Sequence, residues 1–164
     1  MSDHSPMIDP LLALALRAGE AEMEIYKTDF DIYEKADESP VTEADRRAER
    51  LILQGLGDIA PEVPVVAEEN VSAGVVPDVS GGRFWLVDPL DGTKEFIKRN
   101  GEFTVNIGLV ENGEPVLGVV HAPAAGVTYW AYREAGQGRA WRQADGEDPH
   151  PIQARQVDER AGLV

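Results

Sequence analysis

The segment Trp85–Phe96, WLVDPLDGTKEF, decides how the rest of the chain is interpreted. The apolar run that leads into it, from Arg83 to Val87, predicts a buried strand. The run stops at Asp88, Pro89 then turns the chain without leaving an unpaired N–H group, and Asp91 follows three positions after the first acid. Two carboxylates this close repel each other, so the segment predicts either a tight turn or a bound cation.

These two interpretations need different surroundings. Asp, Pro and Gly are the usual residues of tight turns, and turn chemistry alone accounts for Asp-Pro-Leu-Asp-Gly. In the second interpretation, the turn brings the side chains of Asp88 and Asp91 and the carbonyl of Leu90 toward one point. Oxygen ligands grouped in this way are those that Mg²⁺ prefers. The motif by itself favours neither interpretation.

The residues after the second acid predict a seat for phosphate. Gly92 and Thr93 lead into TKEFI, which can begin a short helix. The free N–H groups at a helix N-terminus, aided by the helix dipole, attract anions. A metal beside a phosphate is the arrangement that metal-assisted phosphoryl hydrolysis requires.

A third acid comes from the preceding segment. Val63–Ala67 predicts a short strand that ends at Glu68. If this strand lies beside the strand of Asp88, Glu68 reaches the same metals. The alternative is that Glu68 is a solvated loop acid, and this is the interpretation for its neighbour Glu69.

Asp45 is a fourth candidate, and two roles are open to it. It follows Thr42 by three positions, at the start of a helix predicted over residues 43–56. This spacing is that of a capping box, in which Thr42 is the N-cap and Asp45 is the acidic member. Helix N-termini also face active sites, where Asp45 would hydrogen-bond a threonine hydroxyl and help to align a water.

The remaining patterns predict an α+β fold, with layered helices on a mostly antiparallel sheet. Apolar residues at helical spacing predict a first helix over residues 8–26. Asn112-Gly113 is a strong hairpin signal. Strands are predicted over residues 103–110, 116–121, 127–133 and 139–142.

Composition restricts the function classes. The chain has 164 residues, of which 43% are hydrophobic, and this is enough for one core. The net charge of −15 disfavours nucleic acid and anionic lipid as partners. Cysteine is absent, which excludes disulfides and thiolate metal sites and fits a cytoplasmic protein. No apolar run reaches the ~18 residues of a membrane span, and the N-terminal apolar patch predicts an amphipathic helix, not a signal peptide.

The acids and the residues around them match a known family. Asp45 in VTEAD, Glu68-Glu69, and DPLDGT at residues 88–93 resemble the lithium-sensitive, Mg²⁺-dependent inositol monophosphatase superfamily. The continuation TKEFIKRNGEFTVNIGLV, together with VLGVVHAP, resembles the CysQ-type 3′(2′),5′-bisphosphate nucleotidases. The resemblance extends from the first predicted helix to about Arg155.

The resemblance implies a metal-binding role for four residues. Glu68, Asp88 and the carbonyl of Leu90 hold the first Mg²⁺. Asp88 also bridges to the second ion, which Asp91 binds as well, and a third ion is possible in the family.

The resemblance also implies which residues act on the substrate. Thr93, paired with Asp45, orients the attacking water, and Glu68 helps to activate it. The implied substrate contacts are Glu68, Leu90, Asp91, Gly92 and Thr93.

The implied reaction is hydrolysis of the 3′-phosphate of adenosine 3′,5′-bisphosphate to AMP and phosphate, which clears a by-product of sulfate assimilation. The implied protein is a cytoplasmic phosphoric monoester hydrolase, with peripheral attachment to the inner membrane face as a family alternative. Its partner is a small nucleotide bisphosphate, not polymeric nucleic acid.

The family pattern is incomplete in this sequence. Family members have a second α/β domain, which supplies a further aspartate from a Trp-Asp-x-Ala motif. Residues 94–164 contain no such motif. We therefore expect residues 1–155 to form a metal- and phosphate-binding N-terminal domain, and residues 156–164 to begin a truncated C-terminal domain. Activity of the chain alone is expected to be impaired.

Three alternatives remain at this stage. An inositol phosphate or another sugar phosphate is the alternative substrate for the same site. A non-catalytic metal- or nucleotide-binding fragment is the alternative outside enzymes. A haloacid-dehalogenase-type phosphatase is disfavoured because its two aspartates are separated by one residue, not two. The basic residues near the motif are interpreted as solvated surface, not as phosphate ligands: Lys35, Lys94, Lys98 and Arg99.

Overall fold

The computed structural model describes residues 4–35, 40–134 and 136–154. Its centre is a seven-stranded sheet, in which the strands lie in chain order. These strands are β3 (Val65–Ala67), β4 (Arg83–Asp91), β5 (Thr104–Glu111), β6 (Glu114–Ala122), β7 (Val127–Glu134), β8 (Gln137–Ala144) and β9 (His150–Pro151). β3 and β4 are parallel, and the other neighbouring pairs are antiparallel.

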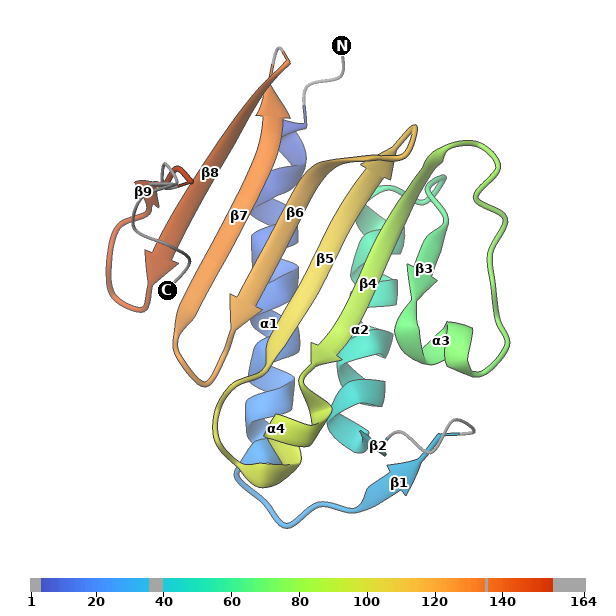
Figure 1. Cartoon of the computed structure of the whole chain (residues 1–164), viewed down its shortest axis with the longest axis vertical. Helices are drawn as coiled ribbons and strands as arrows, with labels where there is room; N and C mark the ends of the chain where they lie inside the picture. The colour runs from blue at the N-terminus through green and yellow to red at the C-terminus, as the bar shows by residue number, and fades with distance from the viewer. Residues whose placement is uncertain (1–3, 36–39, 135, 155–164) are drawn as a thin grey trace, which may run out of the picture.

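Two long helices, α1 (Ile8–Tyr26) and α2 (Glu43–Ile59), cover one face of this sheet. Figure 1 shows α1 behind β5 and β6, and α2 behind β4. The predicted α+β architecture, with helices layered on a mostly antiparallel sheet, is therefore confirmed. The shorter elements are η1 (Ser5–Met7), β1 (Ile32–Glu34), β2 (Pro40–Thr42), α3 (Glu68–Ser72) and α4 (Thr93–Lys98). β1 and β2 form a separate antiparallel pair.

The main core lies between the helices and the covered face of the sheet. Alternate residues of β5 point into it, because successive side chains of a strand face opposite sides. Val105, Ile107 and Leu109 are at most 2% exposed. A second, smaller cluster of buried residues lies near the motif and contains Ala44, Leu90, Phe96 and Phe103.

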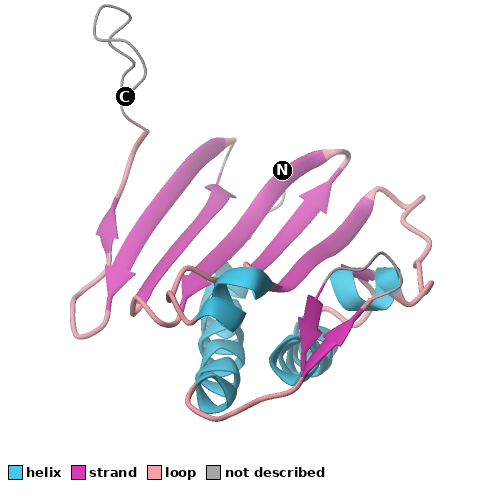
Figure 2. Ribbon diagram, turned by 60° about the horizontal axis from the view of Figure 1, so that its bottom comes forward, coloured by secondary structure: helices cyan, strands magenta, loops and turns pink. Residues whose placement is uncertain are grey.

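The opposite face of the sheet is open (Figure 2). Leu86, Val120 and Tyr129 are 51%, 41% and 41% exposed there. A cavity of about 650 Å³ lies among residues of β4 to β8, and Asp88 and Asn106 are among the residues that line it. The polar end of this largely apolar cavity therefore adjoins the motif.

Two local predictions need correction. The strand that was expected to stop at Val87 extends to Asp91, with a register shift between Asp88 and Asp91. Pro89 therefore lies within an irregular strand, since a bulge tolerates a residue without an N–H group. The helix predicted to end near Leu56 continues to Ile59.

The other predicted elements agree with the structure to within a few residues, whereas η1, β1, β2, α3 and β9 were not predicted. Asn112 and Gly113 form the predicted hairpin turn, with φ values of 53° and 81°, as a type I′ turn requires. The expected start of a second domain, residues 156–164, lies outside the described residues. Within the described part of the chain, no helix is both long and apolar enough to span a membrane.

Candidate functional site

Glu68 and Asp88 are brought together by the parallel pairing of β3 and β4. Ala67 lies opposite Val87, so the next residue of each segment emerges at the same edge of the sheet. Burial raises the pKa of Asp88 to about 7, and the side chain of Glu68 and the charge of Asp91 add to this. The predicted approach of these acids is therefore observed, although Glu68 begins α3 rather than ending a strand.

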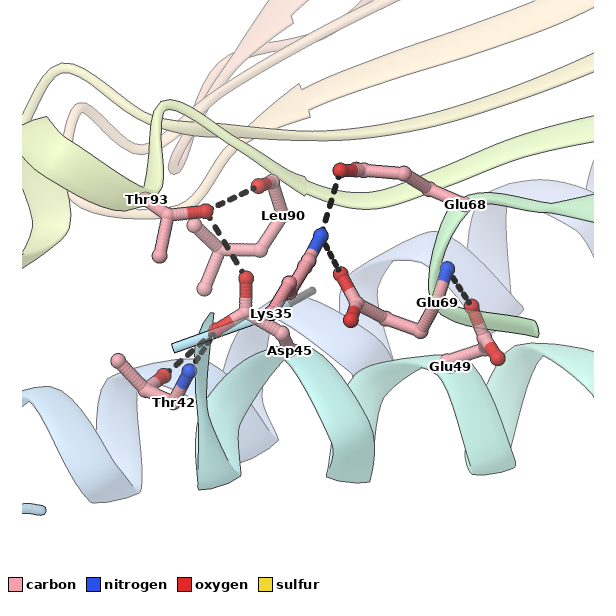
Figure 3. A network of polar contacts seen from close by, with 8 residues as sticks. All are labelled: Lys35, Thr42, Asp45, Glu49, Glu68, Glu69, Leu90 and Thr93. Atoms are coloured by element: carbon pink, nitrogen blue, oxygen red, sulfur yellow. Dashed lines mark hydrogen bonds and ion pairs between the residues drawn. The ribbon is translucent and has the colours of Figure 1, made fainter. Parts of the chain in front are cut away.

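Asp45 completes a capping box and also hydrogen-bonds a threonine hydroxyl, the contact that its proposed site role requires. Its Oδ2 accepts hydrogen bonds from the Thr42 N–H and the Thr42 hydroxyl, both at 2.7 Å, and the capping box of α2 is complete. Its Oδ1 accepts a hydrogen bond from the Thr93 hydroxyl at 3.0 Å, across 48 residues of sequence. Figure 3 shows this carboxylate between the two threonines. Asp45 is 1% exposed, and burial raises its pKa although the hydrogen bonds oppose the shift.

Lys35 is not a solvated surface residue, and Glu69 is not a solvated loop acid. Lys35 Nζ lies 2.8 Å from Glu68 Oε1 and 2.6 Å from Glu69 Oε1 (Figure 3). The side chains of Lys35 and Glu69 are only 9% and 12% exposed. Burial opposes the charged form of Lys35, but its bonds to the two acids raise its pKa. Nothing in the local sequence indicates this contact, because Lys35 and Glu68 are 33 residues apart.

The other basic residues agree better with prediction. Lys94 and Lys98 are exposed. Arg99 is exposed too, but its guanidinium donates hydrogen bonds to the carbonyl oxygens of Tyr26 and Thr28. It therefore fastens the end of α4 to the end of α1.

Gly92 is required by the backbone at the start of α4. Its φ is 96°, a conformation that strains residues with a Cβ. A Cβ at this position would lie 2.7 Å from the carbonyl oxygen of Glu102. Asp91, just before it, is exposed and accepts a hydrogen bond from Asn106 Nδ2 at 3.3 Å. Glycine therefore allows the chain to pass directly from the second acid into α4.

The acids do not form a closed metal cage. Among the described residues, no group of three or more His, Asp or Glu side chains is placed to hold a metal. Glu68 has Lys35 as its counter-ion, whereas Asp88 Oδ1 is buried and has no hydrogen-bond partner within residues 4–35, 40–134 and 136–154. A cation at this carboxylate would relieve the repulsion from Glu68 and Asp91, which adds to the effect of burial on the pKa of Asp88. The donors are all oxygen atoms, so the set fits Mg²⁺.

Two buried acids were missed by the sequence analysis. Glu49 Oε2 accepts a hydrogen bond from the Glu69 N–H at 2.8 Å (Figure 3). Glu22 in α1 is fully buried, and burial raises its pKa well above 4.5, with further contributions from the charges of Asp45 and Asp88. Helical spacing could have identified Glu22, since it lies on the same face as Leu11, Ala15 and Ala18.

The sequence matches the profile of the inositol monophosphatase family over residues 3–160. The 3′(2′),5′-bisphosphate nucleotidases CysQ of Shigella flexneri and Escherichia coli K12 are 49% identical over 142 residues, which are 85% of this chain and 56% of each relative. CysQ of Buchnera aphidicola is 42% identical over 139 residues, or 84% of this chain and 51% of the relative.

Solved structures of CysQ and IMPase proteins are also similar to this chain. CysQ of Bacteroides thetaiotaomicron is 38% identical with a TM-score of 0.59, covering 90% of this chain and 51% of that one. An IMPase of Thermotoga maritima is 30% identical with a TM-score of 0.68, covering 96% and 56%. The chain thus spans about half the length of the relatives that it matches.

Proposed function

The chain belongs to the inositol monophosphatase family, and from this premise we propose that it is the metal- and phosphate-binding part of a Mg²⁺-dependent phosphatase. The observation that carries the proposal is the meeting of three segments at one edge of the sheet. Glu68 and Asp88 interact there, and Thr93 is bonded to Asp45 close by.

The metal would be held by the carboxylates of Glu68, Asp88 and Asp91 and by the carbonyl of Leu90. When bound, Mg²⁺ supplies positive charge that polarises a phosphoryl group and favours deprotonation of water. Lys35 forms ion pairs with both Glu68 and Glu69, and its single positive charge offsets part of their negative charge. The number of ions, two or three, is part of the proposal.

Thr93 and Asp45 would position the attacking water. The Thr93 hydroxyl donates a hydrogen bond to Asp45 Oδ1 at 3.0 Å, and Leu90 O is a second acceptor at 3.3 Å. Because the proton of this hydroxyl is directed into the protein, its oxygen lone pairs are left to accept a hydrogen bond from water. Glu68 would accept the proton that this water loses.

The phosphate would bind to the backbone N–H groups of Gly92 and Thr93. Gly92 has no side chain that would cover its own N–H, and the chain turns there with φ of 96°. The N–H groups of a first helical turn have no intrahelical acceptors, so they are available to an anion. The charge of the phosphate would thus be shared between backbone donors and metal.

The substrate that we favour is adenosine 3′,5′-bisphosphate, cleaved at its 3′-phosphate to AMP in the cytoplasm, as a clearance step linked to sulfate assimilation. The support is the 49% identity to proteins named 3′(2′),5′-bisphosphate nucleotidase. An inositol or other sugar phosphate is the alternative for the same site. A binding fragment without turnover is a second candidate function, because the chain spans only 56% of those relatives.

The test is phosphate release by the 164-residue chain with Mg²⁺, from adenosine 3′,5′-bisphosphate and from inositol 1-phosphate in parallel. Asp88→Asn is expected to lower turnover roughly 100-fold or more, because the metal contributes several kcal/mol to the transition state. Asp148→Asn, in an exposed loop, is the matched control. Full activity of Asp88→Asn would refute the phosphatase site. Nucleotide binding without any release would favour the binding fragment.

A further inference from the structure

Glu22 is the buried acid that the proposed function leaves without a role. It is 0% exposed, and neither Oε1 nor Oε2 has a hydrogen-bond partner among the described residues. A buried carboxyl group without partners costs several kcal/mol relative to water. Such groups in folded proteins are normally bonded to protein or to enclosed water.

The surroundings of Glu22 indicate where its partner lies. Asp45 and Asp88 are both close enough for their negative charges to act on the Glu22 carboxyl group. Both oxygens of Asp45 already have donors, since Oδ2 accepts two hydrogen bonds from Thr42 and Oδ1 accepts one from Thr93. Asp88 differs, because its Oδ1 is buried and has no hydrogen-bond partner in the described part of the chain.

Three oxygen atoms are therefore buried without donors among the described residues, namely both oxygens of Glu22 and Oδ1 of Asp88, and the charge of Asp88 acts on the Glu22 carboxyl group. A buried water typically makes about three hydrogen bonds to groups that would otherwise be unsatisfied. One water can donate to each of the two carboxyl groups and so join them.

We propose that Glu22 is a positioning residue for Asp88: an enclosed water joins the two side chains and fixes the orientation in which Asp88 presents its outer oxygen to a cation. Outer-shell partners of this kind orient metal ligands in proteins, and their loss typically weakens metal binding about 10- to 100-fold. The inference rests on the proposed metal-binding role of Asp88.

Two substitutions separate positioning from packing. Glu22→Gln keeps the shape and the hydrogen-bonding oxygen, and it is a close substitute because burial favours the neutral form by raising the pKa of Glu22. Glu22→Leu introduces an apolar side chain of similar size, which cannot hydrogen-bond to the water. Glu20 is an exposed acid on the same helix, so Glu20→Gln and Glu20→Leu are the matched controls.

The measurement is the Mg²⁺ dissociation constant of the 164-residue chain by titration calorimetry, with circular dichroism to verify folding. We expect Glu22→Gln and both controls to stay within about threefold of wild type, and Glu22→Leu to bind at least about tenfold more weakly. Equal affinity of Glu22→Leu and wild type would overturn the proposal. Equal weakening by Gln and Leu would overturn it too, because the shared oxygen would then be irrelevant.

A second measurement needs no metal, so it distinguishes this proposal from the proposed function. Glu22→Leu, Asp88→Asn and the double variant are compared by urea unfolding. If a water joins the two residues, the unfolding constant of the double variant should differ roughly threefold or more from the product of the single effects. Independent effects would refute the link, even if wild type binds Mg²⁺. Coupling in a chain that binds no Mg²⁺ would support the link and count against the metal site.

Discussion

Burial of side chains has opposite energetic consequences in the body of the sheet and at the edge near Asp88. In the body, Val105 and Ile107 are apolar and fully enclosed, so burial stabilises the fold. At the edge, burial raises the pKa of Asp45 and Asp88, which means that the charged forms are held at a cost. Strongly perturbed acids of this kind gather at functional sites. Apolar burial in the body thus stabilises the fold, and this stabilisation offsets the cost of burying charged groups at the edge.

Removal of body side chains should give the largest effect. Ile107→Ala, at a position 2% exposed, is expected to lower the free energy of unfolding by about 3–4 kcal/mol through lost burial and a cavity. Leu86→Ala is the matched control, since Leu86 is 51% exposed on the open face, and it should cost about 0.5 kcal/mol or less. Urea unfolding measures both. Similar costs for the two would mean that the open face is covered in solution.

A close contact in the body should give the next largest effect. A Cβ at Gly19 would lie 2.5 Å from the His121 ring, whose Nδ1 is held 2.9 Å from Thr128 Oγ1. Gly19→Ala is therefore expected to cost about 2 kcal/mol by overpacking. Gly57→Ala, in α2 with no atoms within 4 Å of its Cβ position, should instead stabilise the chain by up to about 1 kcal/mol. Thermal unfolding checks both, and a stabilised Gly19→Ala would contradict the packing.

At the edge, the clearest stability effect is expected at the capping box. In Asp45→Asn, one of the two oxygen acceptors becomes an amide donor, so the bonds from Thr42 or from Thr93 are lost. We expect a cost of about 1–2 kcal/mol, with a much larger loss of phosphatase activity if Thr93 positions the water. Asp58→Asn, in the exposed last turn of the same helix, is the control. An active, equally stable Asp45→Asn would remove the distinction between edge and body.

The smallest effect concerns pH. The pKa of Glu22 is raised above 4.5 in the folded chain, so the folded state holds this proton more tightly than the unfolded state. The resulting stabilisation is complete below pH 4.5 and is lost as pH rises through the folded pKa. Wild type should therefore lose stability relative to Glu22→Gln as pH is raised above 4.5.

This comparison is made as the difference between the two chains at each pH, by urea unfolding. The difference cancels the titration of groups that do not interact with Glu22, including His121, whose pKa is lowered by burial and whose contribution has the opposite direction. A difference that does not change with pH would show that Glu22 is not the titrating group.

Local patterns predicted most of the fold. The helices follow from apolar spacing, and the hairpin at Asn112-Gly113 follows from the need for positive φ in its turn. The pairing of Glu68 with Asp88 was predictable as well, since both acids follow strands whose ends meet. α2 was predicted to end at residue 56 but continues to Ile59, although glycines at positions 55 and 57 disfavour helix there. In fact, a Cβ at Gly55 would lie 2.4 Å from Leu14, so glycine serves the close packing of α2 on α1.

Contacts between distant segments could not be predicted from local patterns. Lys35 was assigned to the surface because lysine is usually solvated, but its ammonium group lies between two acids from a segment 33 residues away. Glutamate is usually found at the surface, but Glu22 lies on the buried face of α1. In both cases the surrounding tertiary structure, not the residue type, determines whether the side chain is solvated.

The two outermost strands of the sheet are very short. β3 has three residues and β9 has two, so neither strand has a long free outer edge. Long free margins are the usual templates for aggregation by strand addition, and short ones suppress it. If copies of this chain associate at high concentration, we therefore expect contact through the open face of the sheet around Leu86 and Tyr129, without growth of the sheet into fibrils.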